Sequence, residues 1–394
     1  MSIYDNDAFG KILGDISVDA FFRDYWQKKP LIIRNAFDPK LVAGDQPLIS
    51  PEELAGYSLE PDIESRLITN DLQWTLEHGP LDESVFSQVP ESHWTLLVQS
   101  LDYFHPPLQQ LIKSCDFIPR WRLDDVMVSY ATNGGGVGPH LDKYDVFLIQ
   151  GQGQRRWRVG HKDQLVVHFS PHPEIAQIEP FEADMDIIVN AGDMLYIPPN
   201  TPHWGESIDE SICYSVGFRA PNIGSIIQTL LQTLIDNEQT DLDTLWQDGG
   251  KLSSRFSDGQ LHSQLDGWAQ DAIFKLFNKR DLLIAIGKQV TELKYPEAVE
   301  PIDDCEANEL SELAFVKHCS LHPLARMAYF EDDLELLTFI NGEYFQFPLA
   351  LKPIIRALNL NQVIEPQNLR DTPKHPLREF FSCAFLLGAL EIVA

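Results

Sequence analysis

A histidine and an aspartate two positions apart are the first residues in the chain whose spacing could bind a metal. The stretch Gly-Gly-Gly-Val-Gly-Pro-His-Leu-Asp begins at Gly134 and ends with His140 and Asp142. In an extended strand, residues two apart point to the same face, so this imidazole and this carboxylate could meet at one point. The pair needs a third ligand before it predicts a metal site.

That third ligand is supplied by His203, which closes a segment beginning at Gly192. The spacing, Gly, five residues, Pro198, one residue, Asn200, two residues and His203, follows the second sequence motif of cupin barrels. Pro198 ends the pairing of a short strand. Asn200 stands where cupins usually carry glycine, and asparagine tolerates the left-handed backbone conformation. We therefore expect His203 at the mouth of a barrel, beside the His-x-Asp pair.

Two imidazoles and one carboxylate on one face leave the other side of an octahedral metal open. This is the arrangement of non-haem iron(II) oxygenases. Zinc hydrolases also use two histidines and an acid, so the ligand types alone do not choose the metal. A further interpretation takes His140 and His203 as ordinary core or turn histidines that bind no metal.

A 2-oxoglutarate oxygenase also needs a cation inside the barrel, to pair with the distal carboxylate of this co-substrate. The segment Gln154–Val159 contains three arginines in an alternating strand. Alternation places Arg155 on the same face as Trp157, whereas Arg156 and Arg158 fall on the wetter face. An arginine among inward apolar residues is costly unless an anion meets it. We predict that Arg155 is this anchor; the alternative is a surface strand with three solvated arginines.

Short β runs separated by glycine and proline turns must position these residues. The predicted strands are Val126–Tyr130, Asp145–Gln150, Gln154–Val159, Met194–Ile197 and Ile212–Phe218. Many short strands with such turns indicate a sandwich or a barrel. Gly151-Gln152-Gly153 predicts a hairpin connection between the second and third of these strands. A short helix over 20–26 and a strand over 31–34 are expected before them.

After Pro221 the pattern becomes helical, over 226–235 and 261–293. The apolar stripe of the second stretch is typical of a packing or dimer-forming segment; it consists of Trp268, Ile273, Leu276 and Phe277. The acidic, proline-containing stretch 294–304 reads as a linker.

The last ninety residues combine helices with one hairpin. Asn341-Gly342 between the apolar runs 334–340 and 343–347 is a strong hairpin signal. Helices are expected over 310–317, 349–358 and 376–390, which together indicate a winged-helix-like module. From Cys305 to Ala394 there are 12 acids and 7 lysines or arginines, and 7 − 12 = −5 argues against ordinary DNA binding.

Composition excludes several classes of protein. At 44% hydrophobic and 23% charged residues, the chain is not disordered throughout. The net charge of −29 disfavours a nucleic-acid surface. It favours a basic protein partner, and the alternative is a well-solvated acidic cytosolic protein without such a partner. No apolar run reaches the roughly 20 residues needed to cross a membrane. The five scattered cysteines include no Cys-x-x-Cys pair, which fits a reducing cytoplasm.

Taken together, these motifs resemble the bacterial JmjC-type ribosomal oxygenases, a cupin family that hydroxylates a ribosomal protein. Matching motifs are frequent from about residue 20 to residue 221. Beyond residue 221 the chain resembles the family only in the order of its predicted helices and strands. The segments that carry it are Tyr25–Pro30, Trp121–Asp125, Gly134–Arg158, Pro198–His203 and Tyr214–Pro221.

The resemblance implies an α+β fold in three parts. Residues 1–221 would form a JmjC-type double-stranded β-helix (cupin or jelly-roll) with N-terminal helices. Residues 222–300 would form a helical dimerisation segment that makes a homodimer, and residues 301–394 a winged-helix-like domain.

The resemblance also implies a site and a reaction. His140, Asp142 and His203 would bind Fe(II), and Arg155 would anchor 2-oxoglutarate, with O2 as the second co-substrate. The expected substrate is an arginine of large-subunit ribosomal protein L-sixteen, hydroxylated at its β-carbon (C3). Nine residues before His140, where family members can carry a serine near the co-substrate, this chain has Ala131. The departure removes a hydroxyl contact and leaves the metal ligands unaffected.

Substrate selection leaves alternatives open. Three acids, Asp124, Asp125 and Asp145, are candidates for an acidic rim that would hold the substrate arginine. A JmjC-type N-methyl-lysine demethylase would use the same chemistry with an aromatic cage near the metal. A metal-binding cupin that serves as an interaction module without turnover is the non-enzymatic alternative.

Overall fold

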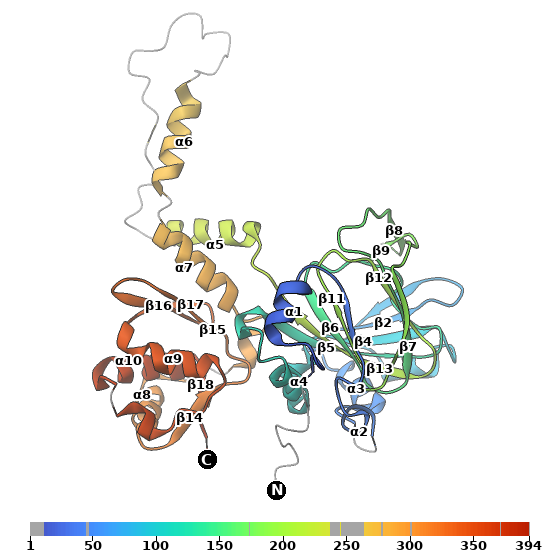
Figure 1. Cartoon of the computed structure of the whole chain (residues 1–394), viewed down its shortest axis with the longest axis horizontal. Helices are drawn as coiled ribbons and strands as arrows, with labels where there is room; N and C mark the ends of the chain where they lie inside the picture. Colours follow the sequence, from blue (N-terminus) through green and yellow to red (C-terminus); the bar gives the residue numbers. More distant parts are fainter. Residues whose placement is uncertain are drawn as a thin grey trace, which may run out of the picture. The chain divides into compact units, whose positions relative to one another are not determined.

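The computed structural model describes residues 12–44, 47–172, 174–236, 245, 264–276, 279–299, 302–370 and 372–393. The chain divides into two compact units, Met1–Ala220 and Pro221–Ala394. Strands dominate the first unit, whereas helices and two small sheets form the second (Figure 1). Among the described residues, no helix is long and apolar enough to cross a membrane.

Two antiparallel sheets build the first unit. The larger has eight strands, in the order β1 (Leu31–Ile33), β11 (Met194–Ile197), β6 (Asp145–Gln150), β13 (Ser211–Phe218), β5 (Leu123–Ala131), β4 (Trp94–Val98), β2 (Ser65–Thr69) and β3 (Thr75–His78). The smaller has the order β10 (Met185–Asn190), β7 (Gln154–Val159) and β12 (His203–Ser207). A separate pair consists of β8 (His168–His172) and β9 (Ile175–Ile178).

The two sheets share a core that includes Val146 and Leu148 of β6 together with Trp157 and Val159 of β7. Alternating residues of β7 are buried, which matches its period-two pattern. Two packed antiparallel sheets of this kind form the predicted double-stranded β-helix.

A second core lies on the other face of the large sheet, where short helices pack. These are α1 (Val18–Asp24), α2 (Pro39–Ala43), α3 (Pro51–Tyr57) and α4 (Gln109–Ser114), with 3-10 turns η2 (Glu83–Ser87), η3 (Leu101–Tyr103), η4 (Pro106–Leu108) and η5 (Arg120–Arg122). The Ser17 side chain caps α1, and its residue Phe21 packs edge-on against Tyr196 of β11 at a centroid distance of 5.1 Å. The helices therefore support the sheet without entering its concave side.

The predicted hairpin around Gly151–Gly153 is wrong. Strand β6 pairs with β11 and β13, whereas β7 pairs with β10 and β12 in the other sheet. The glycine turn carries the chain across from one sheet to the other, and both strands find their partners farther along the chain. Local turn chemistry indicates the bend but not which strands pair.

The second unit contains α5 (Ile223–Asp236), α6 (Gln264–Leu276), α7 (Lys279–Thr291), η7 (Pro296–Ala298), α8 (Asp304–Leu313), β14 (His318–Leu321), β15 (Met327–Glu331), β16 (Glu335–Ile340), β17 (Glu343–Pro348), η8 (Leu349–Leu351), α9 (Lys352–Asn359), η9 (Pro366–Leu369), α10 (Lys374–Leu386) and β18 (Leu390–Val393). Its sheets are β15–β16–β17 and β14–β18. The expected Asn341-Gly342 hairpin joins β16 and β17, with positive φ at both turn residues.

Three helix predictions in this unit need correction. The helix predicted over 376–390 is α10, which ends at Leu386, and Leu390 begins the strand β18. The stretch 261–293 contains two helices, α6 and α7, with residues 261–263, 277 and 278 (including the predicted stripe residue Phe277) outside the described residues. Helix α8 begins at Asp304, six residues before the predicted start, because the Asp303 side chain caps it by accepting from the Glu306 backbone N–H.

Candidate metal centre and co-substrate cavity

The backbone alone brings the three predicted metal ligands together. His140 and His203 form an isolated antiparallel bridge, with N···O distances of 3.0 and 3.1 Å in its two directions. The Asn200 N–H donates to the Asp142 carbonyl at 2.8 Å. Asn200 takes the left-handed conformation expected of it, with φ of 57°. The turn before β12 therefore fixes both histidines and the aspartate relative to one another.

Both imidazoles present the same nitrogen to the centre of the site. Nδ1 of His140 lies 3.0 Å from the Gly138 carbonyl, and Nδ1 of His203 lies 2.9 Å from the Thr201 carbonyl. A carbonyl can only accept, so each Nδ1 carries the proton and each Nε2 keeps its lone pair. Such outer hydrogen bonds fix the tautomer of metal-binding histidines.

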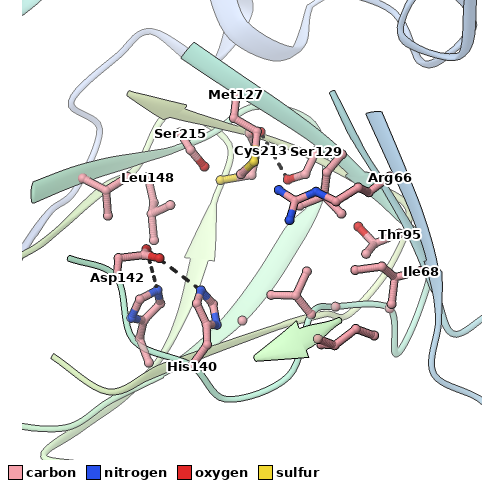
Figure 2. Close-up of a pocket in the computed structure, with 18 of the residues that line it drawn as sticks. Arg66, Ile68, Thr95, Met127, Ser129, His140, Asp142, Leu148, Cys213 and Ser215 are labelled. Carbon is pink, nitrogen blue, oxygen red and sulfur yellow. Dashed lines mark hydrogen bonds and ion pairs between the residues drawn. The ribbon is translucent and has the colours of Figure 1, made fainter. Parts of the chain in front are cut away.

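One potential ligand atom from each of His140, Asp142 and His203 lies within 4.8 Å of the others. Asp142 Oδ2 is 3.4 Å from Nε2 of His203 and 4.0 Å from Nε2 of His140. Figure 2 shows the carboxylate facing the two rings from across the site. Two imidazole nitrogens and one carboxylate oxygen at this separation would suit a divalent iron.

The charge states at neutral pH also suit a metal. Burial, reinforced by the neighbouring His203, lowers the pKa of His140 to about 4. Burial alone would raise the pKa of Asp142, but hydrogen bonding to His203 and the nearby His140 lower it to about 2. The nearby Tyr144 also contributes to lowering the pKa of this carboxyl. His140 is thus neutral and Asp142 ionised, so neither must exchange a proton before it binds a cation.

These ligands lie in a cavity of about 320 Å³ on the concave side of the large sheet. Its walls combine apolar residues of β2, β4, β5 and β9 with a few polar groups (Figure 2). Ile68, Leu97 and Ile175 form a small buried cluster within this wall. The polar groups other than the metal ligands include Arg66, Thr95, Ser129, Arg155 and Ser215.

Arg155 lies where strand alternation places it, buried on the inner face of β7, whereas Arg156 is exposed and paired with Asp186. Its guanidinium donates to the Ser211 hydroxyl at 2.8 Å and to the Ser129 hydroxyl at 2.9 Å. Burial lowers the pKa of Arg155. Among the described residues, no carboxylate forms an ion pair with it, so a buried positive charge faces the cavity without an anion.

The three acids considered for substrate binding are not among the described residues that line this cavity. Asp145 is fully buried and accepts from Tyr196 at 2.6 Å and from Arg122 at 3.1 Å. Asp125 accepts from Gln99 at 2.7 Å and from Ser100 at 2.6 Å. Asp124 lies beside Asp125 on β5. Their role in holding a substrate stays a prediction, to which the structure adds these internal contacts.

Sequence reasoning assigned no role to Tyr144, Ser129 or Arg66, all of which line the cavity. Ser129 lies on the predicted strand 126–130, whereas no strand was predicted around Arg66, and the concave face of β2 is known only once its partner strand is known. No local pattern links Arg66 to ligands more than seventy positions away.

Comparison with known proteins agrees with this site. Residues 110–226 match the JmjC domain family. The chain is 43% identical to the Escherichia coli ribosomal protein uL16 3-hydroxylase over 219 residues, 55% of this chain and 57% of that protein. It is 32% identical to a probable ribosomal oxygenase of Haemophilus influenzae over 84% of this chain and 82% of that protein. The E. coli ribosomal oxygenase YcfD, solved with cobalt and 2-oxoglutarate, superposes with a TM-score of 0.74 at 28% identity, covering 96% of this chain and 99% of that one.

The chain therefore belongs to the JmjC ribosomal oxygenase family, as its motifs predicted, and its barrel is the JmjC-type double-stranded β-helix.

Proposed function

We propose that this protein is an Fe(II)- and 2-oxoglutarate-dependent protein hydroxylase that acts on the β-carbon of an arginine in ribosomal protein uL16. The observation that carries the proposal is the His140–Asp142–His203 cluster, which opens into the same cavity as the buried, anion-free Arg155. A relative named for uL16 3-hydroxylation and a neighbour solved with 2-oxoglutarate support the choice of substrate and co-substrate.

His140, Asp142 and His203 would hold the iron. When bound, iron(II) supplies the activation of O2 that couples oxidative decarboxylation of 2-oxoglutarate to insertion of one oxygen atom into a carbon–hydrogen bond. The Gly138 and Thr201 carbonyls hold the imidazoles in the binding tautomer, and Tyr144 helps to keep the Asp142 carboxyl ionised. Arg155 offers its charge to the co-substrate carboxylate.

The apolar wall would exclude water from the reacting groups. Ile68, Leu97 and Ile175 close one side of the cavity with buried side chains. A drier cavity strengthens the attraction between the Arg155 guanidinium and a bound carboxylate. The same wall would hold the aliphatic part of a substrate side chain against the metal.

The net charge of the chain agrees with a basic substrate. With a net charge of −29, the chain attracts basic proteins, and ribosomal proteins are basic. We extend the proposal to a cytoplasmic protein that works without direct nucleic-acid binding. Residues 222–300 would form the dimerisation segment of a homodimer, and residues 301–394 a winged-helix-like domain.

The test incubates the protein with purified uL16, Fe(II), 2-oxoglutarate and O2. We expect a mass gain of one oxygen atom on an arginine, matched by an equal amount of succinate. An Asp142→Ala variant should produce neither, whereas Asp184→Ala, which removes an exposed carboxylate paired with His161, should retain both.

Other outcomes would select a different function. Loss of a methyl group from a methyl-lysine peptide would indicate the demethylase. Binding of uL16 with no succinate formed under any condition would indicate an interaction module without turnover.

A further inference from the structure

The hydrogen bonds of Arg155 leave it few donors for a co-substrate. Its Nε donates to Ser211 Oγ and its Nη1 to Ser129 Oγ. Its Nη2 donates to the carbonyls of Ser129 at 3.0 Å and Ser211 at 3.3 Å. A guanidinium has five N–H groups, so these four contacts leave one, on Nη1. Two parallel N–H donors make the strongest contact with a carboxylate, and Arg155 alone cannot supply them without losing a contact to the barrel.

A second guanidinium reaches the same cavity from the eight-stranded sheet, whereas Arg155 lies on β7 of the three-stranded sheet. Arg66 lies on β2, and Figure 2 shows its side chain pointing into the cavity on the side where Ser129 lies. The register explains this: Arg66 pairs with Leu97 of β4, and Leu97 pairs with Ser129 of β5. Cross-strand partners share a face, so Arg66 and the serine that accepts from Arg155 belong to one row across the concave side.

Arg66 is oriented but has spare donors. Its one hydrogen bond given by the structure is a long contact of 3.5 Å from Nη2 to the Gln99 side-chain oxygen. The amide nitrogen of Gln99 donates to Asp125 at 2.7 Å, which turns the amide oxygen toward Arg66. Among the described residues, no carboxylate lies within ion-pair distance of Arg66. Asp125 therefore influences Arg66 only indirectly, by orienting Gln99. The Arg66 guanidinium keeps N–H donors for a ligand in the cavity.

With a divalent metal bound, the charges around the cavity favour an anionic ligand. Its described lining contains two arginines, Arg66 and Arg155, and two acids, Asp142 and Glu174. Asp142 faces the metal position, and Glu174 is paired with His78 at 2.7 Å. A divalent metal would add two further positive charges. A dianionic ligand offsets these charges, and two guanidinium groups that line the same cavity match a carboxylate with two oxygens.

We propose that Arg66 is a second binding residue for the dicarboxylate 2-oxo acid, sharing its distal carboxylate with Arg155. This inference rests on the proposed function, because it concerns the same co-substrate. Gln99 is a positioning residue, which holds Arg66 toward the cavity. The pair of arginines also selects for a dicarboxylate, since a 2-oxo acid without the distal carboxylate would leave both cations unmatched.

The experiment measures co-substrate binding by calorimetry on the full chain loaded with Mn²⁺ without oxygen, so that no turnover is needed. The variant Arg66→Gln is expected to weaken binding of 2-oxoglutarate by about 10- to 100-fold, the loss typical of one charge-assisted contact. Binding of 2-oxopentanoate, which has no distal carboxylate, should change little. Affinity for Mn²⁺ should be unchanged, and the matched variant Arg156→Gln, on the exposed face of β7, should bind 2-oxoglutarate like the wild type.

Each other outcome bears on a different claim. If Arg66→Gln binds 2-oxoglutarate as tightly as the wild type, or loses both acids equally, the role of Arg66 is refuted. If the Mn²⁺-loaded wild type itself fails to bind 2-oxoglutarate, the proposed function fails as well. Thermal unfolding of each metal-free variant shows whether it is folded. Arg66→Lys keeps the charge and serves as the second variant, with partial recovery of 2-oxoglutarate binding expected.

Discussion

His140 and His203 exchange backbone hydrogen bonds in both directions although they are 63 positions apart in the chain. Neither bond involves a side chain, so the two imidazoles are held near each other by the sheet whether or not a metal is bound. Their ring centroids are 4.1 Å apart. The metal centre is therefore preorganised, and its side chains can be tested separately from the fold.

Replacing His203 with alanine should remove metal binding while keeping the fold. The backbone bridge to His140 persists, but one of three ligands is lost. Loss of an outer partner alone costs about 10- to 100-fold in metal affinity, so loss of a ligand should exceed about 100-fold. Titration with Mn²⁺ measures the affinity, and circular dichroism the fold. His161→Ala, which changes an exposed histidine, is the control; equal affinity in both variants would argue against the site.

The low pKa of His140 predicts how the metal-free protein responds to acid. Its pKa is about 4 in the folded chain against an ordinary value of 6.5, mainly because of burial. Between these values the unfolded chain binds a proton that the folded chain does not. The unfolding free energy should therefore fall as pH drops from 6.5 to 4, by at most about 3 kcal/mol from this group.

Urea unfolding in the presence of a chelator, at several pH values from 7 to 4, measures this dependence. The His140→Gln variant should lose part of the slope, and His161→Gln should keep it. A slope in His140→Gln as steep as that of the wild type would show that the buried imidazole does not contribute.

Strand positions and the meeting of His140, Asp142 and His203 were predictable because both depend on local patterns. Strands β6, β7 and β11 have the predicted bounds, and alternation placed Arg155 inward. The pairing of β6 and β7 was not predictable, because a glycine turn specifies a bend and leaves the choice of sheet to distant partners. Arg66 was missed for the same reason, since only the register from β2 to β5 brings it to the cavity.

Asp125 and Asp145 show that sequence alone does not predict the surroundings of an acidic side chain. An acid near a site can face solvent, substrate or the interior, and the sequence does not distinguish these. Asp145 is buried, and burial raises its pKa despite hydrogen bonds from Tyr196 and Gln27. Two of its partners, Tyr196 and Gln27, are more than fifty positions away, and Arg122 is 23 positions away, so no local pattern indicates them.

The turn at Asn200 links the fold to the metal site and can be tested by its backbone conformation. Asn200 has φ of 57°, and its backbone bonds to both Asp142 and Asp163. A β-branched side chain is strained there, so Asn200→Val should lower the unfolding free energy by about 1–2 kcal/mol and weaken metal binding. Asn200→Gly should be close to the wild type in both respects. Equal stability of the two variants, measured in urea, would contradict this account of the turn.

The exposed face of α5 predicts how the proposed homodimer forms. Ile223, Ile227, Leu231 and Ile235 recur every four residues, and their exposed fractions are 72%, 48%, 47% and 63%. Residues at this spacing follow one face of a helix, and such an apolar stripe is typical of a helix that packs against a partner. Leu231→Glu places a charge in the stripe of each protomer. Losing the burial of one leucine costs about 1.5 kcal/mol or more. A symmetric dimer loses two such leucines, so its dissociation constant should rise by at least about 100-fold.

Light scattering over a range of protein concentrations measures this change. Gln232→Glu adds the same charge to the neighbouring exposed position outside the stripe and should leave the dimer intact. If both variants remain dimeric with the wild-type affinity, α5 does not form the dimer interface. If the wild type is monomeric throughout, the homodimer itself is refuted, whereas the metal centre, held within the first unit, is unaffected.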